Sequence, residues 1–350
     1  MNTWRILCGD VREKLAQLPA GAARCCVTSP PYWGLRDYAH SGQLGLESTP
    51  DAYVAAMVDV FREVRRVLAD DGTVWLNLGD SYLGGGGFAP DEPCNQKRAD
   101  GDAEAWGKFN PASMDRMAAK QSAKPKRLLG LKAKDLVGIP WMVAFALRAD
   151  GWYLRSGIIW SKPNPMPESV TDRPTKAHEY IFLLSKSKNY YYDADAIAEP
   201  VAPSQVGRVR EDVIGGASHQ ERGQHSKGGV YKSGNKDRVY GTNLSSPHRA
   251  SGVPWEAETR NKRSVWTVTT QPYPDAHFAT FPEALIEPCV LAGSAHGDTV
   301  LDPFTGSGTT GAVAIRHQRN FIGTELNPAY IELARKRINA VAPMFAQEVA

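Results

Sequence analysis

The sequence predicts an α/β fold in which strands and helices alternate along the chain. Short apolar runs typical of buried strands alternate with stretches whose apolar residues recur at helical spacing. Several of these runs end abruptly at proline, glycine or polar residues, as strands of an open parallel sheet do where a ligand binds. Two long polar stretches interrupt the pattern and are predicted to be loop-rich insertions.

The N-terminal segment contains two predicted strands with a helix between them. Residues 4–8 are predicted to form a short strand, and the helix near 11–18 ends at Pro19-Ala20-Gly21. Residues 23–28 form an apolar run typical of a buried strand. Because proline cannot donate to a sheet ladder, this strand must end before Pro30.

The next elements continue the alternation. Apolar residues between 51 and 69 have the spacing of an amphipathic helix. Asp70-Asp71-Gly72 then predicts a turn that leads into a strand over 73–78. Beyond the first insertion we expect a helix over 136–148 and strands over 153–160 and 179–185.

The C-terminal part predicts a second series of helices and strands. We expect helices near 282–292, 310–317 and 328–341 and strands over 299–301 and 320–324. A glycine-rich turn joins the first of these strands to the helix that follows it. Such a turn lets the backbone approach a ligand at the carboxyl end of a strand.

Composition limits the class of protein. The 350 residues are 42% hydrophobic and 23% charged, and no apolar run is long enough to span a bilayer. The first residues lack the apolar core of a signal peptide, so we expect a cytoplasmic protein. The five cysteines show no C-x-x-C pairing, and we therefore expect reduced thiols and no metal site.

Basic residues are concentrated in the two loop-rich stretches. Residues 116–134 hold seven Lys or Arg and no acidic residue, and residues 201–270 hold eleven against six Asp or Glu. Such stretches can follow a phosphate backbone, although solvated basic loops have the same composition. The formal net charge of +3 does not decide between the two.

The segment 299–310 predicts a site for a nucleoside-containing ligand. It consists of a predicted strand, a tight turn at Gly306 and Gly308, and the start of a helix. Glu325 follows Asp302 by 23 residues, about where a nucleotide-binding unit holds an acid against ribose hydroxyls. The turn lacks the Gly-Lys-Ser/Thr ending of a P-loop and the third glycine of a dinucleotide fold. A cofactor without phosphates, such as S-adenosylmethionine, needs neither.

Two segments resemble the motifs of the amino-group DNA methyltransferases. Asp302-Pro-Phe-Thr-Gly-Ser-Gly-Thr-Thr310 is similar to their cofactor motif, and Thr28-Ser-Pro-Pro-Tyr32 is similar to their catalytic motif. The catalytic motif comes first, which is the permuted order of that family's β group. Further matches are 277–288, which resembles the helix that completes the methionine pocket, and Trp160–Asn164, Arg173-Pro174 and His178–Tyr180.

The resemblance implies a Rossmann-like, S-adenosylmethionine-dependent methyltransferase sheet with permuted motif order and loop-rich insertions. Residues 1–193 would form the catalytic half of the methyltransferase domain, with a mobile basic insertion over 84–135. Residues 194–265 occupy the place of a target-recognition region, and residues 266–350 would form the cofactor-binding half.

The same resemblance implies a set of site residues. Its catalytic residues are Ser29, Pro30, Pro31 and Tyr32. Its cofactor-binding residues are Asp10, Thr28, Phe281, Asp302, Pro303, Phe304, Gly306, Ser307, Gly308, Thr309, Thr310, Glu325 and Asn327. Candidate DNA contacts are Arg36, Lys162, Arg208, Arg210, Arg238 and Arg249. Asp10 can equally cap the helix that follows it, and Arg36 can equally form a structural ion pair.

The chemistry of an exocyclic amine explains the catalytic residue types. The lone pair of the amine is delocalised into the base, so hydrogen-bond acceptors must help to localise it. The Ser29 hydroxyl and the Pro30 carbonyl can accept the two amino hydrogens while Tyr32 stacks on a flipped base. In the family, Ser-Pro-Pro-Tyr is mostly associated with N4 of cytosine; N6 of adenine, which presents the same two hydrogens, is the alternative.

Double-stranded DNA is the expected substrate and partner, which would associate the protein with the nucleoid. Methylation of RNA or protein glutamine is less favoured, because those relatives usually carry Asn-Pro-Pro-Tyr in the unpermuted order. A non-catalytic nucleic-acid-binding relative is also less favoured, since Ser29, Tyr32, Asp302 and Glu325 are all present.

The family is compatible with a cognate restriction endonuclease and with a monomer or a homodimer.

Overall fold

The computed structural model describes residues 2–35, 40, 42–83, 130–201, 259–271, 281–341 and 346–349. The chain divides into two compact units, one formed by Met1–Ile197 with Arg263–Ala350 and the other by Ala198–Lys262. In the second unit the described strands are β6 (Glu199–Pro200) and β7 (Thr259–Arg260), which pair antiparallel. The remaining described elements belong to the first unit.

The first unit is built on a nine-stranded sheet. Its strands are β1 (Asn2–Cys8), β2 (Ala23–Thr28), β3 (Leu68–Leu78), β4 (Tyr153–Ser161), β5 (His178–Ser185), β8 (Val265–Thr267), β9 (Thr299–Asp302), β10 (Asn320–Glu325) and β11 (Ala346–Glu348). Their order is β11-β1-β10-β9-β2-β3-β5-β4-β8. Neighbours are parallel except that β5 runs antiparallel to β3 and β4. The predicted α/β fold with a mostly parallel sheet is confirmed.

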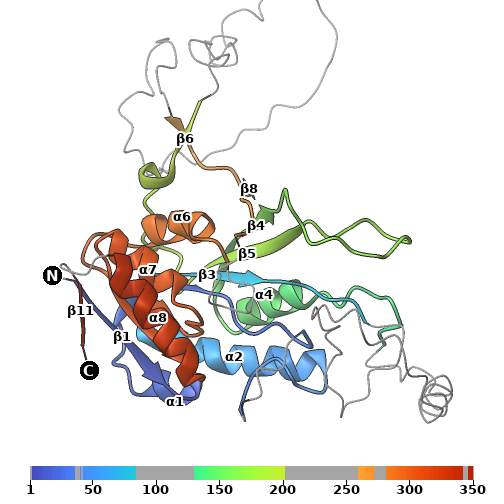
Figure 1. Cartoon of the computed structure of the whole chain (residues 1–350), viewed down its shortest axis with the longest axis horizontal. Helices are drawn as coiled ribbons and strands as arrows, with labels where there is room; N and C mark the ends of the chain where they lie inside the picture. The colour runs from blue at the N-terminus through green and yellow to red at the C-terminus, as the bar shows by residue number, and fades with distance from the viewer. Residues whose placement is uncertain are drawn as a thin grey trace, which may run out of the picture. The chain divides into compact units, whose positions relative to one another are not determined.

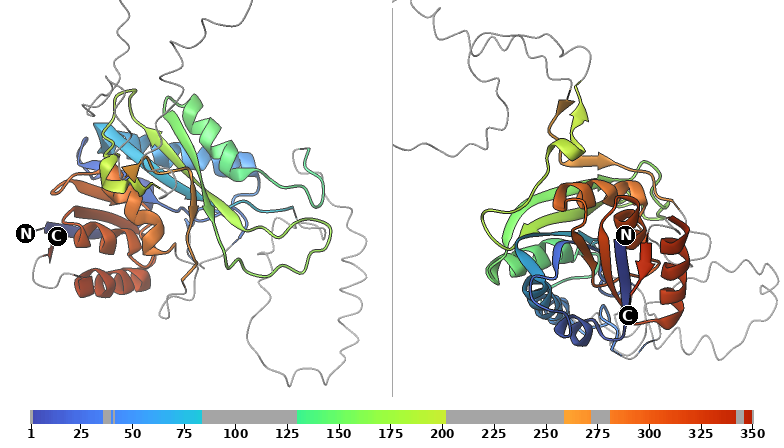
Figure 2. Two further views of the ribbon diagram at one scale, coloured as in Figure 1. Left: turned by 90° about the horizontal axis from the view of Figure 1, so that it is seen from above. Right: turned by 90° about the vertical axis from the view of Figure 1, so that its left-hand side faces the viewer.

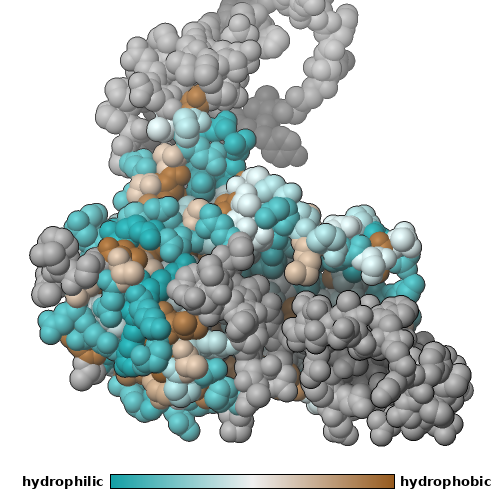
Figure 3. All heavy atoms as spheres, viewed as in Figure 1, coloured by the Kyte–Doolittle hydropathy of each residue, from teal (hydrophilic) through white to brown (hydrophobic). Residues whose placement is uncertain are grey.

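Helices cover both faces of the sheet (Figures 1 and 2). One face carries α1 (Val11–Ala16), α2 (Pro50–Val67) and α4 (Ile139–Ala149). The other carries α6 (Glu283–Gly293), α7 (Thr309–Arg316) and α8 (Pro328–Val341). The outward surface of α7 and α8 is largely hydrophilic (Figure 3).

Alternation along each central strand divides the core between the two faces. In β3, Val74, Leu76 and Leu78 belong to the cluster under α2 and α4, whereas Trp75 belongs to the cluster under α6. A strand that is buried on both faces needs apolar residues at every position. This explains why residues 73–78 form a nearly continuous apolar run.

The sequence around α2 shows how local residues set an element. Thr49 accepts a hydrogen bond from the amide of Ala52, and Pro50 occupies the first turn. The apolar face of α2 includes Tyr53 and Phe61, both fully buried against the sheet. Burial of such side chains stabilises the fold by roughly 1.5–3 kcal/mol each.

The start of β3 differs from the prediction. The turn expected at Asp70-Asp71-Gly72 is wrong, because strand geometry already begins at Leu68. Pairing with β2 shifts register between Ala23 and Cys25, so the polar residues are accommodated in an irregularity of the ladder. Asp71 forms an ion pair with Arg24 of β2, which holds this segment in the sheet.

The helix predicted over 136–148 begins later, at Ile139. The amides of Gly138 and Ile139 donate to Asp80 Oδ1 over 2.9 and 3.2 Å. A carboxylate just beyond β3 therefore caps α4, which sequence spacing does not show. The short strands β6, β7, β8 and β11 were not predicted, because two or three residues carry no measurable period.

The two predicted insertions are described only at their ends. Residues 84–129 and 202–258 lie outside the described residues. Within the described ranges, every helix is too short or too polar to cross a membrane. Cys25, Cys26 and Cys289 are buried in the core of the first unit.

Candidate active site

The carboxyl ends of five parallel strands meet at one edge of the sheet. These strands are β1, β10, β9, β2 and β3. Because β5 runs in the opposite direction, its first residues lie at the same edge. The two segments that carry the sequence motifs, 28–32 and 302–310, both follow strands that end there.

The turn between β9 and α7 requires glycine at two positions. Gly306 and Gly308 have φ angles of 51° and 79°, which L side chains rarely adopt. A Cβ atom on Gly308 would lie 2.8 Å from the Cα of Ala334 in α8. The turn is therefore packed tightly against α8.

Asp302 is buried at the end of β9 and connects the two motifs. Its Oδ1 accepts a hydrogen bond from the Thr28 hydroxyl at 2.6 Å, although the two residues are 274 positions apart. The same oxygen accepts from the amide of Phe304 at 3.1 Å. Burial raises the pKa of Asp302 to about 6, and hydrogen bonds from the Thr28 hydroxyl and the Phe304 amide oppose that rise.

Glu325 ends the adjacent strand β10 and faces the same turn. Its Oε2 accepts from the amide of Gly306 at 2.8 Å, and its Oε1 accepts from the amide of Asn327 at 2.9 Å. Burial raises the pKa of Glu325, whereas these backbone bonds lower it. Since β9 and β10 pair directly, Asp302 and Glu325 place two carboxylates at neighbouring strand ends.

Arg337 of α8 contacts the side chains on either side of Gly308 in the glycine turn. Its guanidinium donates to Thr309 Oγ1 at 2.7 Å and to Ser307 Oγ at 3.2 Å. It also forms an ion pair of 2.9 Å with Glu283 at the start of α6. The side chains of the predicted cofactor residues Ser307 and Thr309 thus both contact Arg337, and their contact with a cofactor stays a prediction.

Two further predicted cofactor residues act as helix caps. Asp10 accepts from the amide of Arg12 at 2.8 Å and pairs with its guanidinium at 2.7 Å, which lowers the pKa of Asp10. Asn327 Oδ1 accepts from the amide of Ala329 at 2.9 Å. Of the two roles considered for Asp10, the structure shows the cap; contact with an adenine ring stays a prediction.

The other predicted cofactor residues line the same region. The Pro303 carbonyl accepts from Thr324 Oγ1 at 2.5 Å, and Thr310 Oγ1 donates to the carbonyl of Val27 at 3.3 Å. Phe304 and Phe281 are partly buried beside the turn and the start of α6, respectively. The turn is thus tied to β2 as well as to β10.

The segment Ser29–Tyr32 leaves the sheet directly after β2. Pro30 is buried, whereas Ser29 and Tyr32 are partly exposed. The Tyr53 hydroxyl on α2 donates to the carbonyl of Pro31 at 2.9 Å and anchors the turn. A Cβ atom on Gly79 would overlap the Tyr32 ring, so glycine after β3 makes room for that ring.

The hydroxyl of Tyr32 lies in a polar network with side chains from β3 and β5. It is 2.8 Å from Glu179 Oε2 and 3.0 Å from Asn77 Oδ1, and it accepts from Ser29 Oγ at 3.3 Å. Burial and the nearby Glu179 carboxylate raise the pKa of Tyr32 well above its usual range. The hydroxyl therefore keeps its proton at neutral pH.

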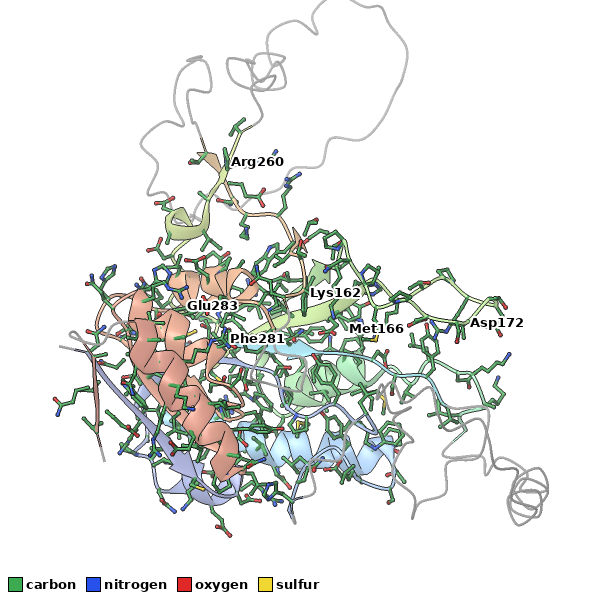
Figure 4. All side chains as sticks on the ribbon, in the orientation of Figure 1. Lys162, Met166, Asp172, Arg260, Phe281 and Glu283 are labelled. Atoms are coloured by element: carbon green, nitrogen blue, oxygen red, sulfur yellow. The ribbon has the colours of Figure 1, made fainter. Side chains whose placement is uncertain are left out.

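Lys162 completes this network from the end of β4. Its ammonium forms an ion pair with Glu179 Oε1 and lies 4.1 Å from the centre of the Trp160 ring. The side chains of Lys162 and Glu179 are only 17% and 16% exposed. Beyond Lys162 the chain runs away from the sheet through Met166 to Asp172 (Figure 4).

The sequence matches a known protein family over most of its length. Residues 23–336 match the model of the N6/N4 methyltransferases, described as DNA methylase. The chain belongs to this DNA methylase family. The family expected from the two motifs is thereby confirmed.

Curated relatives of this DNA methylase are found at high identity. The Type II methyltransferase M.SmaI of Serratia marcescens is 42% identical over 339 residues, which is 97% of this chain and 91% of the relative. The Type II methyltransferase M.Cfr9I of Citrobacter freundii is 43% identical over 332 residues, which is 94% of this chain and 86% of the relative.

Solved structures share the fold of this DNA methylase. The cytosine-N4-specific PvuII DNA methyltransferase superposes with a TM-score of 0.56 at 17% identity, covering 96% of this chain and 86% of the other. A putative DNA modification methylase of Thermus thermophilus, solved with S-adenosyl-L-methionine, gives 0.53 at 21% identity and covers 100% of both chains. The predicted Rossmann-like class is confirmed.

Asn77, Glu179 and Arg337 of this DNA methylase were not among the predicted site residues. Asn77 interrupts the apolar strand β3, and a polar residue inside a buried strand is a signal for a functional contact. Glu179 lies in a segment that matched the family, but only the antiparallel course of β5 brings it opposite Tyr32. Arg337 follows an ordinary helical pattern and carries no such signal.

Most predicted DNA contacts of this DNA methylase lie outside the described residues. These are Arg36, Arg208, Arg210, Arg238 and Arg249. Lys162 is described, and its ion pair with Glu179 joins it to the network of the Tyr32 hydroxyl. A contact between Lys162 and DNA stays a prediction.

Proposed function

We propose that this DNA methylase transfers the methyl group of S-adenosylmethionine to N4 of cytosine at a specific site in duplex DNA. The observation that supports this most directly is the hydrogen bond between Thr28 and Asp302. It brings the segment Ser29–Tyr32 beside the glycine turn after β9. A single centre therefore combines acceptors for an amine with carboxylates for a nucleoside.

The residues around the turn suit S-adenosylmethionine. Asp302 and Glu325 can accept hydrogen bonds from its ammonium and ribose hydroxyl groups. A ligand without phosphates fits a turn flanked by two carboxylates, because phosphate charge would be repelled there. Gly306 allows the backbone to come close to the ligand. When bound, the cofactor supplies an electrophilic methyl group on sulfur.

Ser29 and Pro30 activate the amine of the base. The Ser29 hydroxyl and the Pro30 carbonyl accept its two hydrogens, which localises the lone pair on nitrogen. The proline rings restrict the backbone of the segment, and the bond from Tyr53 to the Pro31 carbonyl holds it in place. These acceptors are preorganised, so little reorganisation is needed when the base enters.

A cytosine inside a duplex must leave the base stack before it reaches this segment. Tyr32 offers a ring on which the flipped base can stack. Its hydroxyl is held by Asn77 and Glu179, so the orientation of the ring is fixed before the base arrives. Alignment of the amine with the methyl group then supplies much of the rate by positioning.

The serine at position 29 favours N4 of cytosine over N6 of adenine. This preference rests on the resemblance of Ser-Pro-Pro-Tyr to the cytosine-specific form of the motif. Both amines present the same hydrogens to the same acceptors, so contacts to the ring edge decide between the bases. Adenine N6 is the alternative product.

Target recognition is assigned to residues 194–265, within a methyltransferase domain whose halves are 1–193 and 266–350. Arg, Lys, Asn and Gln side chains of this region can read base edges. The relatives M.SmaI and M.Cfr9I are Type II methyltransferases. We therefore include a cognate restriction endonuclease of the same specificity as a biological partner.

Transfer of labelled methyl groups to mixed-sequence duplex DNA, followed by nucleoside mass spectrometry, tests the proposal. N4-methylcytosine is the expected product. Ser29→Ala should lower the rate on the order of 100-fold, because one acceptor of the amine is lost. N6-methyladenine would overturn the choice of base, and absence of label in DNA would overturn the proposed substrate.

A further inference from the structure

The hydrogen bonds that join Ser29, Tyr32 and Glu179 all have the same donor-to-acceptor direction, from Ser29 toward Glu179. Ser29 Oγ donates to Tyr32 Oη at 3.3 Å, and Tyr32 has a single proton to donate onward. Its two acceptors are Glu179 Oε2 at 2.8 Å and Asn77 Oδ1 at 3.0 Å. Each hydroxyl proton in this chain therefore points away from the amine site.

Glu179 is the point on which these donors converge. Besides the bond from Tyr32, Glu179 Oε2 accepts a hydrogen bond from the side-chain amide of Asn77 at 3.3 Å, and Oε1 pairs with the ammonium of Lys162. Asn77 also donates to the carbonyl of Tyr180 at 3.1 Å, which fixes its amide with the oxygen toward Tyr32. An amide oxygen is a very weak base, so the carboxylate of Glu179 is the group in this network that can take up a proton.

Methyl transfer to an amine creates a proton that must leave. The exocyclic nitrogen forms a bond to the methyl carbon while the carbon–sulfur bond breaks, and the electron pair of that bond stays on sulfur. The nitrogen then carries a positive charge and two hydrogens. Neutral product requires that one of these N–H bonds break and that a base accept the proton.

We propose that Glu179 accepts this proton through Ser29 and Tyr32. The nitrogen gives its proton to Ser29 Oγ, Ser29 gives its own to Tyr32 Oη, and Tyr32 gives its own to Glu179 Oε2. Both hydroxyls end as they began, and Glu179 ends protonated. The proton passes from Glu179 to solvent before the next cycle, so atoms and charges balance.

The arrangement accounts for two features of the site. Ser29 can accept from the amine because its own hydrogen is directed at Tyr32. Lys162 pairs with Glu179 Oε1, whereas Tyr32 faces Oε2, the oxygen that would receive the proton. Both side chains retain some exposure through which the proton can leave. Glu179 does not touch the base in this scheme. It acts on the base only through Ser29 and Tyr32.

Single-turnover methylation by Glu179→Gln tests the relay, which rests on the proposed function. Glutamine keeps an oxygen that accepts from Tyr32 but cannot hold the proton. We expect the rate of the chemical step to fall on the order of 100-fold or more, within the range of general acid–base catalysis. Dissociation constants for S-adenosylmethionine and for DNA should stay within about twofold of wild type. Glu179→Asp should recover part of the rate.

Tyr32→Phe provides a second, independent break in the relay. It should lower the chemical step to a similar extent, and adding Glu179→Gln should cause little further loss, because both changes interrupt one path. Glu63→Gln on α2 is the matched control, since Glu63 also pairs with a basic residue, Arg66, but makes none of the contacts described for Tyr32, Asn77 or Lys162. Its rate should equal that of wild type.

The relay is overturned if Glu179→Gln methylates at the wild-type rate. It is also overturned if the loss appears as weaker DNA or cofactor binding, or if the losses of Tyr32→Phe and Glu179→Gln multiply. Thermal melting of each variant checks that it is folded. Failure of the proposed function would look different, because the wild-type protein itself would then leave DNA unmethylated.

Discussion

Asp302 places an acidic group in a buried position at the end of β9. Burial raises its pKa from 3.8 to about 6. This shift corresponds to roughly 3 kcal/mol in the free energy of ionising the side chain. The folded protein therefore binds a proton at Asp302 more tightly than the unfolded chain does. The contribution of protonated Asp302 to the free energy of unfolding is fully present below about pH 4 and is lost as the pH rises through about 6.

Asp302→Asn should stabilise the protein without cofactor at neutral and higher pH. The asparagine is neutral and isosteric, so it removes the cost of a buried charge. The difference in free energy of unfolding should be largest at about pH 8 and should shrink as the pH falls through about 6. Urea unfolding at several pH values measures it.

Asp59→Asn, a change of an exposed carboxylate on α2, is the control for Asp302→Asn. A stability difference that does not vary with pH would contradict the role given to Asp302. The same variant should bind S-adenosylmethionine more weakly than wild type, because it loses one of the two carboxylates that we propose to bind the ammonium and ribose groups.

At the scale of elements, the turn between β9 and α7 depends on α8. Gly308 lies against the backbone of Ala334, whereas the nearest atom to a Cβ on Gly306 is the Phe304 carbonyl oxygen at 4.0 Å. Both glycines have positive φ angles. The two positions therefore share the same backbone constraint but differ in how much space surrounds them.

Gly308→Ala should destabilise the protein much more than Gly306→Ala. The change at Gly306 imposes a left-handed conformation on alanine, at a cost of about 1 kcal/mol. The change at Gly308 adds a clash with helix backbone and should cost at least about 3 kcal/mol. Urea unfolding of the two variants gives the comparison, and equal losses would show that α8 does not support the turn.

At the scale of the whole molecule, DNA binding is expected to depend on basic residues far from the motifs in sequence. Arg208, Arg210, Arg238 and Arg249 lie in the predicted recognition region, outside the described residues. Each arginine that neutralises a phosphate contributes about 0.9 to the slope of log affinity against log salt concentration.

Replacing these four arginines by glutamine should weaken DNA binding and lower the salt slope by up to about 4. Fluorescence anisotropy at low and moderate salt measures both quantities. The control neutralises four basic residues on the surface of the first unit, Arg62, Lys188, Arg335 and Lys336. Unchanged affinity at both salt concentrations would remove the region from the interface.

The sequence by itself determined the element types and the motifs of this protein. Apolar periodicity and residue type are local properties, so β2 and α8 were predicted with their observed bounds. The glycines of the cofactor turn and the Ser29–Tyr32 segment were also apparent, because their chemistry lies in adjacent residues. Predictions were less accurate where a distant group changes the local outcome, as Asp80 does at the start of α4.

Only the tertiary structure decided which of these residues meet. Strand order brings Thr28 to Asp302, and the antiparallel course of β5 brings Glu179 to Tyr32. Arg337 reaches the glycine turn because α8 packs against α7. The physical reason is that long-range pairing and the burial of both faces decide which strands of the sheet are neighbours. Neither can be read from the spacing of apolar residues along the chain.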